Sequence, residues 1–214
     1  MRRFALALLV VLAAPCLMGA GQLAPRRHLD LSEADRTELD AISAALNAIT
    51  TLKGSFLQIE PSGAVDEGQF YISKPGKMRF EYKPPVPTLI VADGRSVAVA
   101  NTRLNTVDRY SLGDTPLGLV LDNTLDIRHD PNLVGVEHQQ GVIVISMRTS
   151  QNRAKANIAL VFSEPDYELR QWTVVDDQGL STTVALRSQQ PGVALAPALF
   201  VLPEKNALAR RREN

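Results

Sequence analysis

The stretch YISKPGKMRFEYKPPVPTLIVADG, from Tyr71 to Gly94, decides how the rest of the chain is interpreted. Met78, Phe80 and Tyr82 alternate with charged residues, which is typical of a strand with one apolar face. The proline-rich run at 84–87 then ends the strand, and because proline cannot join a strand ladder, it indicates a sheet edge or a gap. The stretch contains no catalytic motif, so it fits the wall of an apolar site better than a catalytic centre.

The composition is that of an ordinary globular domain. The chain has 214 residues, 45% of them hydrophobic and 21% charged, which is enough to bury a core within a single domain. Its formal net charge is zero, from 23 basic and 23 acidic residues. A neutral chain has no overall field that attracts nucleic acid or acidic membranes, so we expect no nucleic-acid partner.

The N-terminus has the pattern of a secretory signal peptide over residues 1–21. Arg2 and Arg3 precede the apolar run FALALLVVLAAPCLMGAG, and the small residues near its end allow several cleavage points. Residues 22–29 then form a flexible spacer. Cys16 leaves a second interpretation open, a lipid-anchored protein, although Pro15 fits poorly before a lipidated cysteine. Once the signal is removed, the chain has no cysteine and therefore no disulfide or thiolate metal site.

One helix and a series of strands are predicted after the spacer. The segment DLSEADRTELDAISAALNAITTL, residues 30–52, suits an amphipathic helix that starts near Ser32 and Asp35. Its apolar residues recur at helical spacing: Leu39, Ile42, Leu46 and Ile49. Strands are predicted near 54–60, 69–73, 78–82, 88–92, 96–101, 106–111, 133–137, 142–148, 157–162, 169–175, 181–188 and 199–202.

The turns predict how these strands connect. Asp93-Gly94 is the strongest hairpin signal, and the turn residues at 101–105, 139–141 and 176–179 each join neighbouring strands. The sheet should therefore be an antiparallel meander. The segment TPLGLVL, residues 115–121, predicts a small helix that opens at Pro116.

No motif in the sequence indicates an enzyme or a metalloprotein. The three histidines, His28, His129 and His138, show neither metal-ligand spacing nor the order of a catalytic triad. The acidic pair Asp176 and Asp177 is explained by its turn. No phosphate-binding or dinucleotide-binding glycine motif occurs. We therefore expect no catalytic residue, no metal and no cofactor.

Several segments, taken together and in order, resemble the LolA family of periplasmic outer-membrane lipoprotein carriers. They are LKGSFLQ from Leu52, GQFYISKPGKMRFEY from Gly68, LIVADG from Leu89, DTPLGLVL from Asp114, and LRSQQPG with ALFVLP near the end. The resemblance runs from about Leu39 to Pro203. It places a carrier domain at 30–204 and leaves residues 205–214 as a basic C-terminal tail.

The resemblance implies a mainly β fold with helices, in the α+β class. An incomplete antiparallel β-barrel of about 11 strands would be covered by lid helices, with a hydrophobic cavity beneath them for lipoprotein acyl chains. The predicted 30–52 and 115–121 helices would belong to this lid. The expected function is that of a non-enzymatic chaperone in the periplasm, which carries lipoproteins from the inner to the outer membrane.

The resemblance also implies site residues. Those expected to line the cargo site are Leu46, Ile49, Met78, Phe80, Tyr82, Leu117, Val120, Leu121 and Trp172. From the sequence alone, an apolar strand face is most often ordinary core, and helix packing alone would also require Leu46 and Ile49. Lys74 occupies a position where many family members have an arginine that ties the sheet to the lid. Lysine cannot reproduce a planar bidentate donor, so Arg79 is a second candidate for lid closure.

The implied partners are lipoproteins, an inner-membrane lipoprotein-release ABC transporter and an outer-membrane acceptor lipoprotein, with the carrier itself a monomer. Two other functions remain open at this point. One is a carrier of free lipids, such as a glycolipid or a hopanoid. The other is a regulatory module that senses lipoproteins on the same fold, which a second domain would favour.

Overall fold

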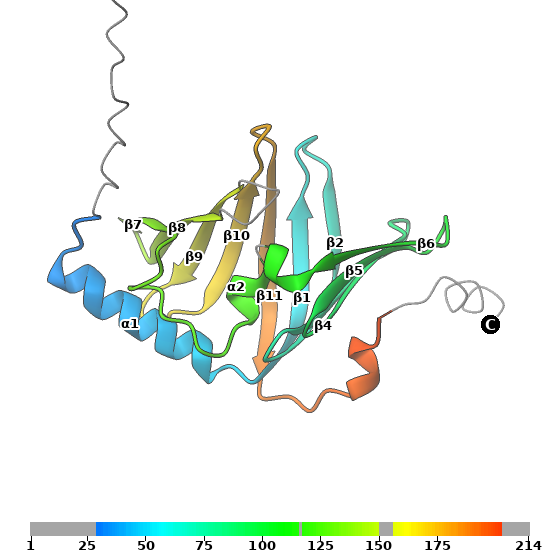
Figure 1. Ribbon diagram of the computed structural model, residues 1–214, viewed down its shortest axis with the longest axis horizontal. Coiled ribbons are helices and arrows are strands. Elements are labelled where there is room, and N and C mark those ends of the chain that lie inside the picture. The colour runs from blue at the N-terminus through cyan, green and yellow to red at the C-terminus, as the bar shows by residue number, and fades with distance from the viewer. Residues whose placement is uncertain (1–28, 116, 150–155, 203–214) are drawn as a thin grey trace, which may run out of the picture.

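The computed structural model describes residues 29–115, 117–149 and 156–202. Eleven strands form one antiparallel sheet that does not close (Figure 1). The strands are β1 (Thr51–Ile59), β2 (Val65–Ser73), β3 (Lys77–Tyr82), β4 (Thr88–Asp93), β5 (Ser96–Asn101), β6 (Thr106–Ser111), β7 (Leu133–Gln139), β8 (Val142–Thr149), β9 (Ala156–Ser163), β10 (Leu169–Val175) and β11 (Ser181–Pro191). Their order is β6-β5-β4-β3-β2-β1-β11-β10-β9-β8-β7, so β1 and β11 join two meanders.

All eleven strands and the antiparallel meander were predicted correctly from the sequence. The turn between β4 and β5 forms as expected: Gly94 has a φ of 104°, and Asp93 Oδ1 accepts hydrogen bonds from the backbone N–H groups of Arg95 and Ser96. The three other predicted turns join β5 to β6, β7 to β8, and β10 to β11.

The predicted strand at 199–202 is wrong. This segment contains a 3₁₀ helix, η2 (Pro197–Phe200), with proline at its start. Proline fixes a helical φ and lacks the N–H that a ladder would need. The backbone N–H groups of Leu199 and Val201 bond to the carbonyl oxygens of Ala196 and Ala198 instead.

The prolines after Tyr82 do not mark a sheet edge, contrary to the sequence interpretation. They lie in the connection from β3 to β4, and β3 pairs with strands on both sides, β2 and β4. Proline is tolerated there because the connection makes no ladder. The two edges of the sheet are β6 and β7 instead.

Helix α1 (Glu33–Ala48) confirms the helix prediction. Ser32 caps it: its Oγ accepts a hydrogen bond from the Asp35 backbone N–H, while the Asp35 carboxylate accepts one from the Ser32 backbone N–H. The expectation of several lid helices is not met, because α1 is the one long helix of the described residues. The 115–121 prediction corresponds to α2 (Leu117–Leu121), a single turn that follows the 3₁₀ turn η1 (Leu112–Asp114).

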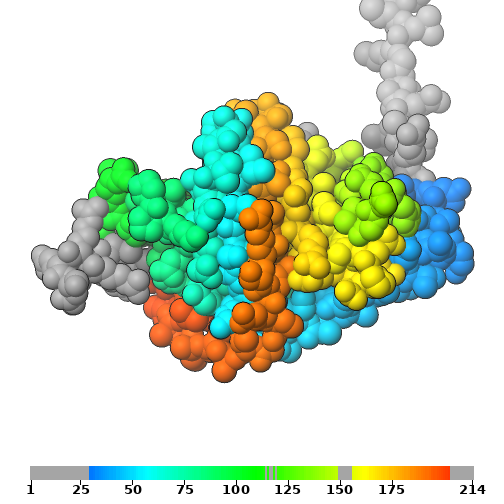
Figure 2. Space-filling view, turned by 180° about the vertical axis from the view of Figure 1, so that it is seen from behind, coloured from blue at the N-terminus to red at the C-terminus, as the bar shows by residue number. Residues whose placement is uncertain are grey.

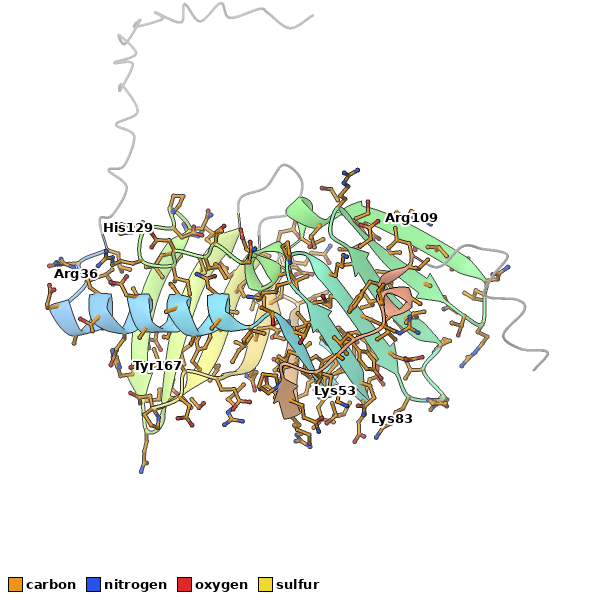
Figure 3. All side chains as sticks on the ribbon, turned by 90° about the horizontal axis from the view of Figure 1, so that it is seen from below. Arg36, Lys53, Lys83, Arg109, His129 and Tyr167 are labelled. Atoms are coloured by element: carbon orange, nitrogen blue, oxygen red, sulfur yellow. The ribbon has the colours of Figure 1, made fainter. Side chains whose placement is uncertain are left out.

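The two faces of the sheet have different coverings. We call the face that shares its apolar core with α1 the inner face; it carries Met78, Phe80 and Tyr82. The opposite, outer face has a smaller apolar cluster of Leu89, Val91 and Ala100, against which Leu202 packs. Figure 2 shows the outer side, where the strands themselves form most of the surface. Figure 3 shows α1 lying along the half of the sheet that includes β7 to β10.

The predicted signal peptide at 1–21 lies outside the described residues, as do Cys16, His28 and the basic tail at 205–214. The described residues fall within the predicted 30–204 domain, apart from residue 29 of the spacer.

Candidate functional site

Aromatic side chains form the centre of the inner face. Phe80 lies 4.7 Å from Phe56 and 5.7 Å from Phe70, measured between ring centroids. Trp172 of β10 meets Phe80 edge-on at 6.0 Å, and Tyr82 meets Phe56 edge-on at 5.0 Å. We call these five residues the aromatic floor. They bring together strands from both meanders, and each of them is less than 9% exposed.

Two glycines make room for this floor. Gly54 of β1 pairs with Phe70 of β2, and Phe56 of β1 pairs with Gly68 of β2. A Cβ atom on Gly54 would lie 2.7 Å from the Phe70 ring, and one on Gly68 would collide with the Phe56 ring. Glycine is therefore required in both pairs because each phenylalanine ring covers the backbone of its partner.

Helix α1 closes over part of the inner face. Leu39, Ile42 and Leu46 are at most 3% exposed and belong to the same apolar cluster as the aromatic floor. A ligand that enters between the helix and the sheet must therefore displace these side chains. Their spacing along α1 gives one continuous apolar stripe.

A strap of residues 122–132, between α2 and β7, holds α1 from the side. Asn47 pairs with the backbone of Leu125 in both directions, with Nδ2 donating at 2.9 Å and Oδ1 accepting at 2.9 Å. The buried Ser43 Oγ donates to the Leu39 carbonyl and accepts from the Ile127 backbone N–H. Arg128 adds an ion pair to Asp40 at 2.8 Å. These polar contacts can open and close without breaking a strand pairing.

Lys74 ties the sheet to the end of α1. Its Nζ donates at 2.9 Å to the carbonyl oxygen of Leu46, in a last helical turn that has no basic residue of its own. A cation at this place complements the helix dipole. Two residues further on, the Gly76 backbone N–H donates to the Leu121 carbonyl at the end of α2. Burial lowers the pKa of Lys74 to about 8, and the nearby Asp122 carboxylate opposes this shift.

The start of α1 is anchored to the edge strand β7. His138 Nε2 lies 2.9 Å from Asp35 Oδ1 and 3.5 Å from Glu38 Oε2. The hydrogen bond between Asp35 and His138 raises the pKa of the imidazole and lowers the pKa of the carboxyl. These three side chains could also reach one cation together. Helix α1 is thus held at both ends, by His138 and by Lys74.

Polar side chains of Tyr82, Gln58 and Glu60 are hydrogen-bonded at the edge of the aromatic floor. Tyr82 Oη donates at 2.6 Å to Gln58 Oε1, and Gln58 Nε2 donates to Glu60 Oε1. Burial is the main cause that raises the pKa of Tyr82, and the negative charges of Glu60 and Asp66 add to it. The phenol is therefore neutral at physiological pH, and it remains a hydrogen-bond donor.

The family of the chain follows from its sequence. A sequence model described as outer membrane lipoprotein carrier protein LolA matches residues 47–203, which is most of the chain. The chain belongs to the LolA family. LolA proteins are non-enzymatic carriers of the periplasm. Within the described residues, none of the helices has the length and the apolar character needed to cross a membrane.

Individual relatives agree with the LolA assignment. An outer-membrane lipoprotein carrier protein of Methylococcus capsulatus is 25% identical over 178 residues, covering 79% of this chain and 85% of the relative. One from Chromobacterium violaceum is 29% identical over 164 residues, covering 74% of this chain and 75% of the relative.

Among solved structures, an uncharacterized conserved protein from Thermus thermophilus aligns with a TM-score of 0.47 and 12% identity, over 78% of this chain and 94% of that chain.

The residues expected to line a LolA cargo site mostly lie together. Leu46, Met78, Phe80, Tyr82, Leu121 and Trp172 are buried in the one inner-face cluster, and Ile49 and Val120 pack against it. The side chain of Leu117 lies outside what the structure describes. Their role in binding cargo stays a prediction, because burial in a shared cluster fits a closed carrier and a plain core alike.

Arg79 lies on the face of the sheet opposite α1. It alternates with Met78 and Phe80 along β3 and therefore points to the outer face. There it pairs with Glu81 at 3.2 Å and donates at 3.4 Å to the carbonyl oxygen of Leu199 in η2. Arg79 thus contacts the C-terminal segment, whereas Lys74 contacts α1.

Sequence reasoning missed several polar members of the site. Ser43 and Asn47 interrupt the helix stripe four residues apart, and that spacing was the available signal. Gln58 continues the period-two row of Phe56 beyond the apolar part of β1. The strap itself has no periodic pattern, so its contacts with α1 become visible only in the structure.

Proposed function

We propose that this LolA-family chain carries lipoproteins through the periplasm, with their acyl chains held between α1 and the aromatic floor. The observation that carries the proposal is the apolar cluster shared by a strand face and one helix, which polar contacts hold at its edges. Such contacts can be exchanged at small net free energy, because water replaces them when the helix moves.

The energetics favour a carrier that fills its own site when empty. Removing one C16 acyl chain from water is worth about 12 kcal/mol, at about 0.8 kcal/mol per buried CH₂. Several chains would exceed the practical limit of non-covalent affinity, which is about 18 to 21 kcal/mol. When cargo leaves, Leu39, Ile42 and Leu46 cover the floor again. The net affinity is therefore a difference between two apolar contacts, and this difference keeps release possible.

Lys74 is the residue that we propose for lid closure. It reaches the last turn of α1, and Gly76 of the same turn reaches α2, so one connection controls both covering elements. A lysine makes a point contact where the resemblance implies an arginine, so closure here depends on fewer hydrogen bonds. For Arg79, the contacts with Glu81 and Leu199 favour a role in holding η2.

Membership of the family also implies partners, which we include in the proposal. We propose that the chain acts as a monomer, that an inner-membrane ABC transporter hands over the lipoprotein, and that an outer-membrane lipoprotein accepts it. The aqueous space between the membranes is the place where acyl chains need such shielding.

The test is lipoprotein release with a photoreactive probe on each face of the sheet. The purified chain is added to inner-membrane vesicles that contain the release transporter, ATP and a tagged lipoprotein. Benzoylphenylalanine replaces Trp172 on the inner face or Tyr71 on the outer face of the neighbouring meander. We expect soluble lipoprotein, cross-linked through position 172 and not through position 71. Absence of release, or equal cross-linking at both positions, would contradict the proposal.

A further inference from the structure

We infer that Gln58 and Tyr82 form a subsite for the polar junction of the cargo, where acyl chains join their carrier molecule through uncharged carbonyl groups. The inference rests on the proposed function and adds a selectivity to it: carbonyls of esters and amides are accepted there, and phosphate is not. The aromatic floor itself could not make this distinction, because the hydrocarbon chains of lipoproteins and phospholipids are the same.

The position of the pair suits a junction. Leu52, Phe56 and Gln58 lie on one row of β1, so the row changes from apolar to polar toward the β1–β2 hairpin. β1 extends for about 27 Å at about 3.4 Å per residue. Lys74 lies beyond the opposite end of this row, because Thr51 pairs with Ser73. In Figure 1 the β1–β2 hairpin projects from the sheet on the side away from α1, which leaves this end farthest from the lid.

The hydrogen-bonding groups match a carbonyl. Tyr82 Oη and Gln58 Nε2 are both neutral donors, and the ring of Tyr82 meets that of Phe56 edge-on. In the closed molecule, Tyr82 donates to Gln58 and Gln58 donates to Glu60, so neither donor is buried without an acceptor. A cargo carbonyl would replace one acceptor with another. Such an exchange costs little, whereas a cargo carbonyl placed here without these donors would be left unpaired.

The charges around the pair disfavour an anion. Glu60 follows Gln58 on the same row, and Asp66 pairs directly with Gln58 across to β2. The nearby Glu67 is already paired with Lys83 at 2.7 Å. A phosphate at this end would face two carboxylates that no described ion pair neutralises. Uncharged or cationic head groups meet no such repulsion.

A displacement experiment tests the selectivity. N-phenyl-1-naphthylamine, an apolar fluorophore, is bound to the full chain and then displaced by a tripalmitoylated cysteinyl peptide without charged residues, or by dipalmitoyl phosphatidylglycerol. The variants are Tyr82→Phe and Gln58→Leu, with Tyr71→Phe on the outer face as the matched control. Thermal melts confirm that each variant is folded.

We expect the unmodified chain to prefer the lipopeptide over the phospholipid by about tenfold, because only the phospholipid brings a phosphate close to Glu60 and Asp66. Tyr82→Phe and Gln58→Leu should each weaken displacement by both ligands several-fold, because both present ester carbonyls, while fluorophore affinity stays the same. Tyr71→Phe should change nothing. The double variant Glu60→Gln, Asp66→Asn should bind the phospholipid more tightly, with less dependence on salt.

The outcomes separate this inference from the proposed function. If neither acylated ligand displaces the fluorophore, the carrier proposal itself fails. If both ligands bind, and Tyr82→Phe and Gln58→Leu leave both affinities unchanged, the subsite is wrong and the carrier proposal stands. A preference for phosphatidylglycerol in the unmodified chain would also overturn the subsite, and it would favour a carrier of free lipids.

Discussion

At the scale of single residues, the inner face depends on what two glycines lack. A phenylalanine ring can lie flat on a strand only where the neighbouring residue has no side chain. Gly54 and Gly68 provide this opposite Phe70 and Phe56, in rows that follow one another along β1 and β2. The result is a broad aromatic surface at the centre of the inner face.

Replacing Gly68 with alanine should damage this surface. The new methyl group would meet the Phe56 ring and the Glu81 carbonyl oxygen, and a backbone oxygen cannot move aside easily. We expect the free energy of unfolding to fall by about 2 kcal/mol, as in other overpacked cores. Gly135→Ala on β7 is the control, because a Cβ there has open space. Equal urea midpoints for the two variants would show that the Phe56 ring does not require Gly68.

The period of the sequence predicted which residues of β3 share a face, and the structure agrees for Met78, Phe80 and Tyr82. The same period could have placed Arg79 on the other face. The contact that Arg79 makes there could not be predicted, because its partner Leu199 lies 120 residues away in a segment for which the sequence predicts a strand. Similarly, no local pattern pairs Tyr82 with Gln58, 24 residues away.

At the scale of elements, α1 is a helix fastened at its ends and along one side. Its capping residues, apolar stripe and length could all be predicted from the sequence, since they are local features. Its fastenings join it to distant parts of the chain: the strap, β7, and the turn between β2 and β3. The sequence could therefore predict a covering helix, but it could not tell which contacts keep it closed.

Removing the Lys74 fastening should loosen α1 without unfolding the protein. In Lys74→Met the Leu46 carbonyl loses its donor, while the cost of burying an ammonium group disappears. We expect amide hydrogen exchange near Leu46 and in the strap to accelerate about tenfold, with global stability little changed. Exchange is measured by mass spectrometry. Lys53→Met, on the outer face of β1, serves as control. Identical exchange in both variants would contradict a role of Lys74 in holding α1.

At the scale of the whole molecule, stability should depend on pH through His138. The charged groups facing its imidazole are Asp35 and Glu38 of α1 and Glu164 beyond β9. The pKa of His138 is raised above 6.5, so its contribution is complete below pH 6.5 and is lost as the pH rises through the raised value. The pKa of Asp35 is lowered, so its contribution is present above pH 3.8.

His138→Gln therefore removes stability only in acid. Between pH 3.8 and pH 6.5 we expect the variant to melt about 1 to 3 °C below the unmodified chain, and at about pH 9 we expect the two melting temperatures to coincide. The imidazole is partly exposed, so the effect is small. Differential scanning calorimetry across this range measures it. A melting difference that does not vary with pH would mean that the histidine acts through packing alone.

One pairing has a consequence for how the chain folds. Every other strand pair joins strands that follow each other along the chain, whereas Leu52 of β1 meets Pro191 at the far end of β11. Each meander can form from local hairpins, but joining them closes a long loop and should come late and slowly. Trp172 and Phe80 lie on opposite sides of this seam. The aromatic floor draws four residues from the first meander and Trp172 from the second, so the complete cargo surface would appear only when the two halves join.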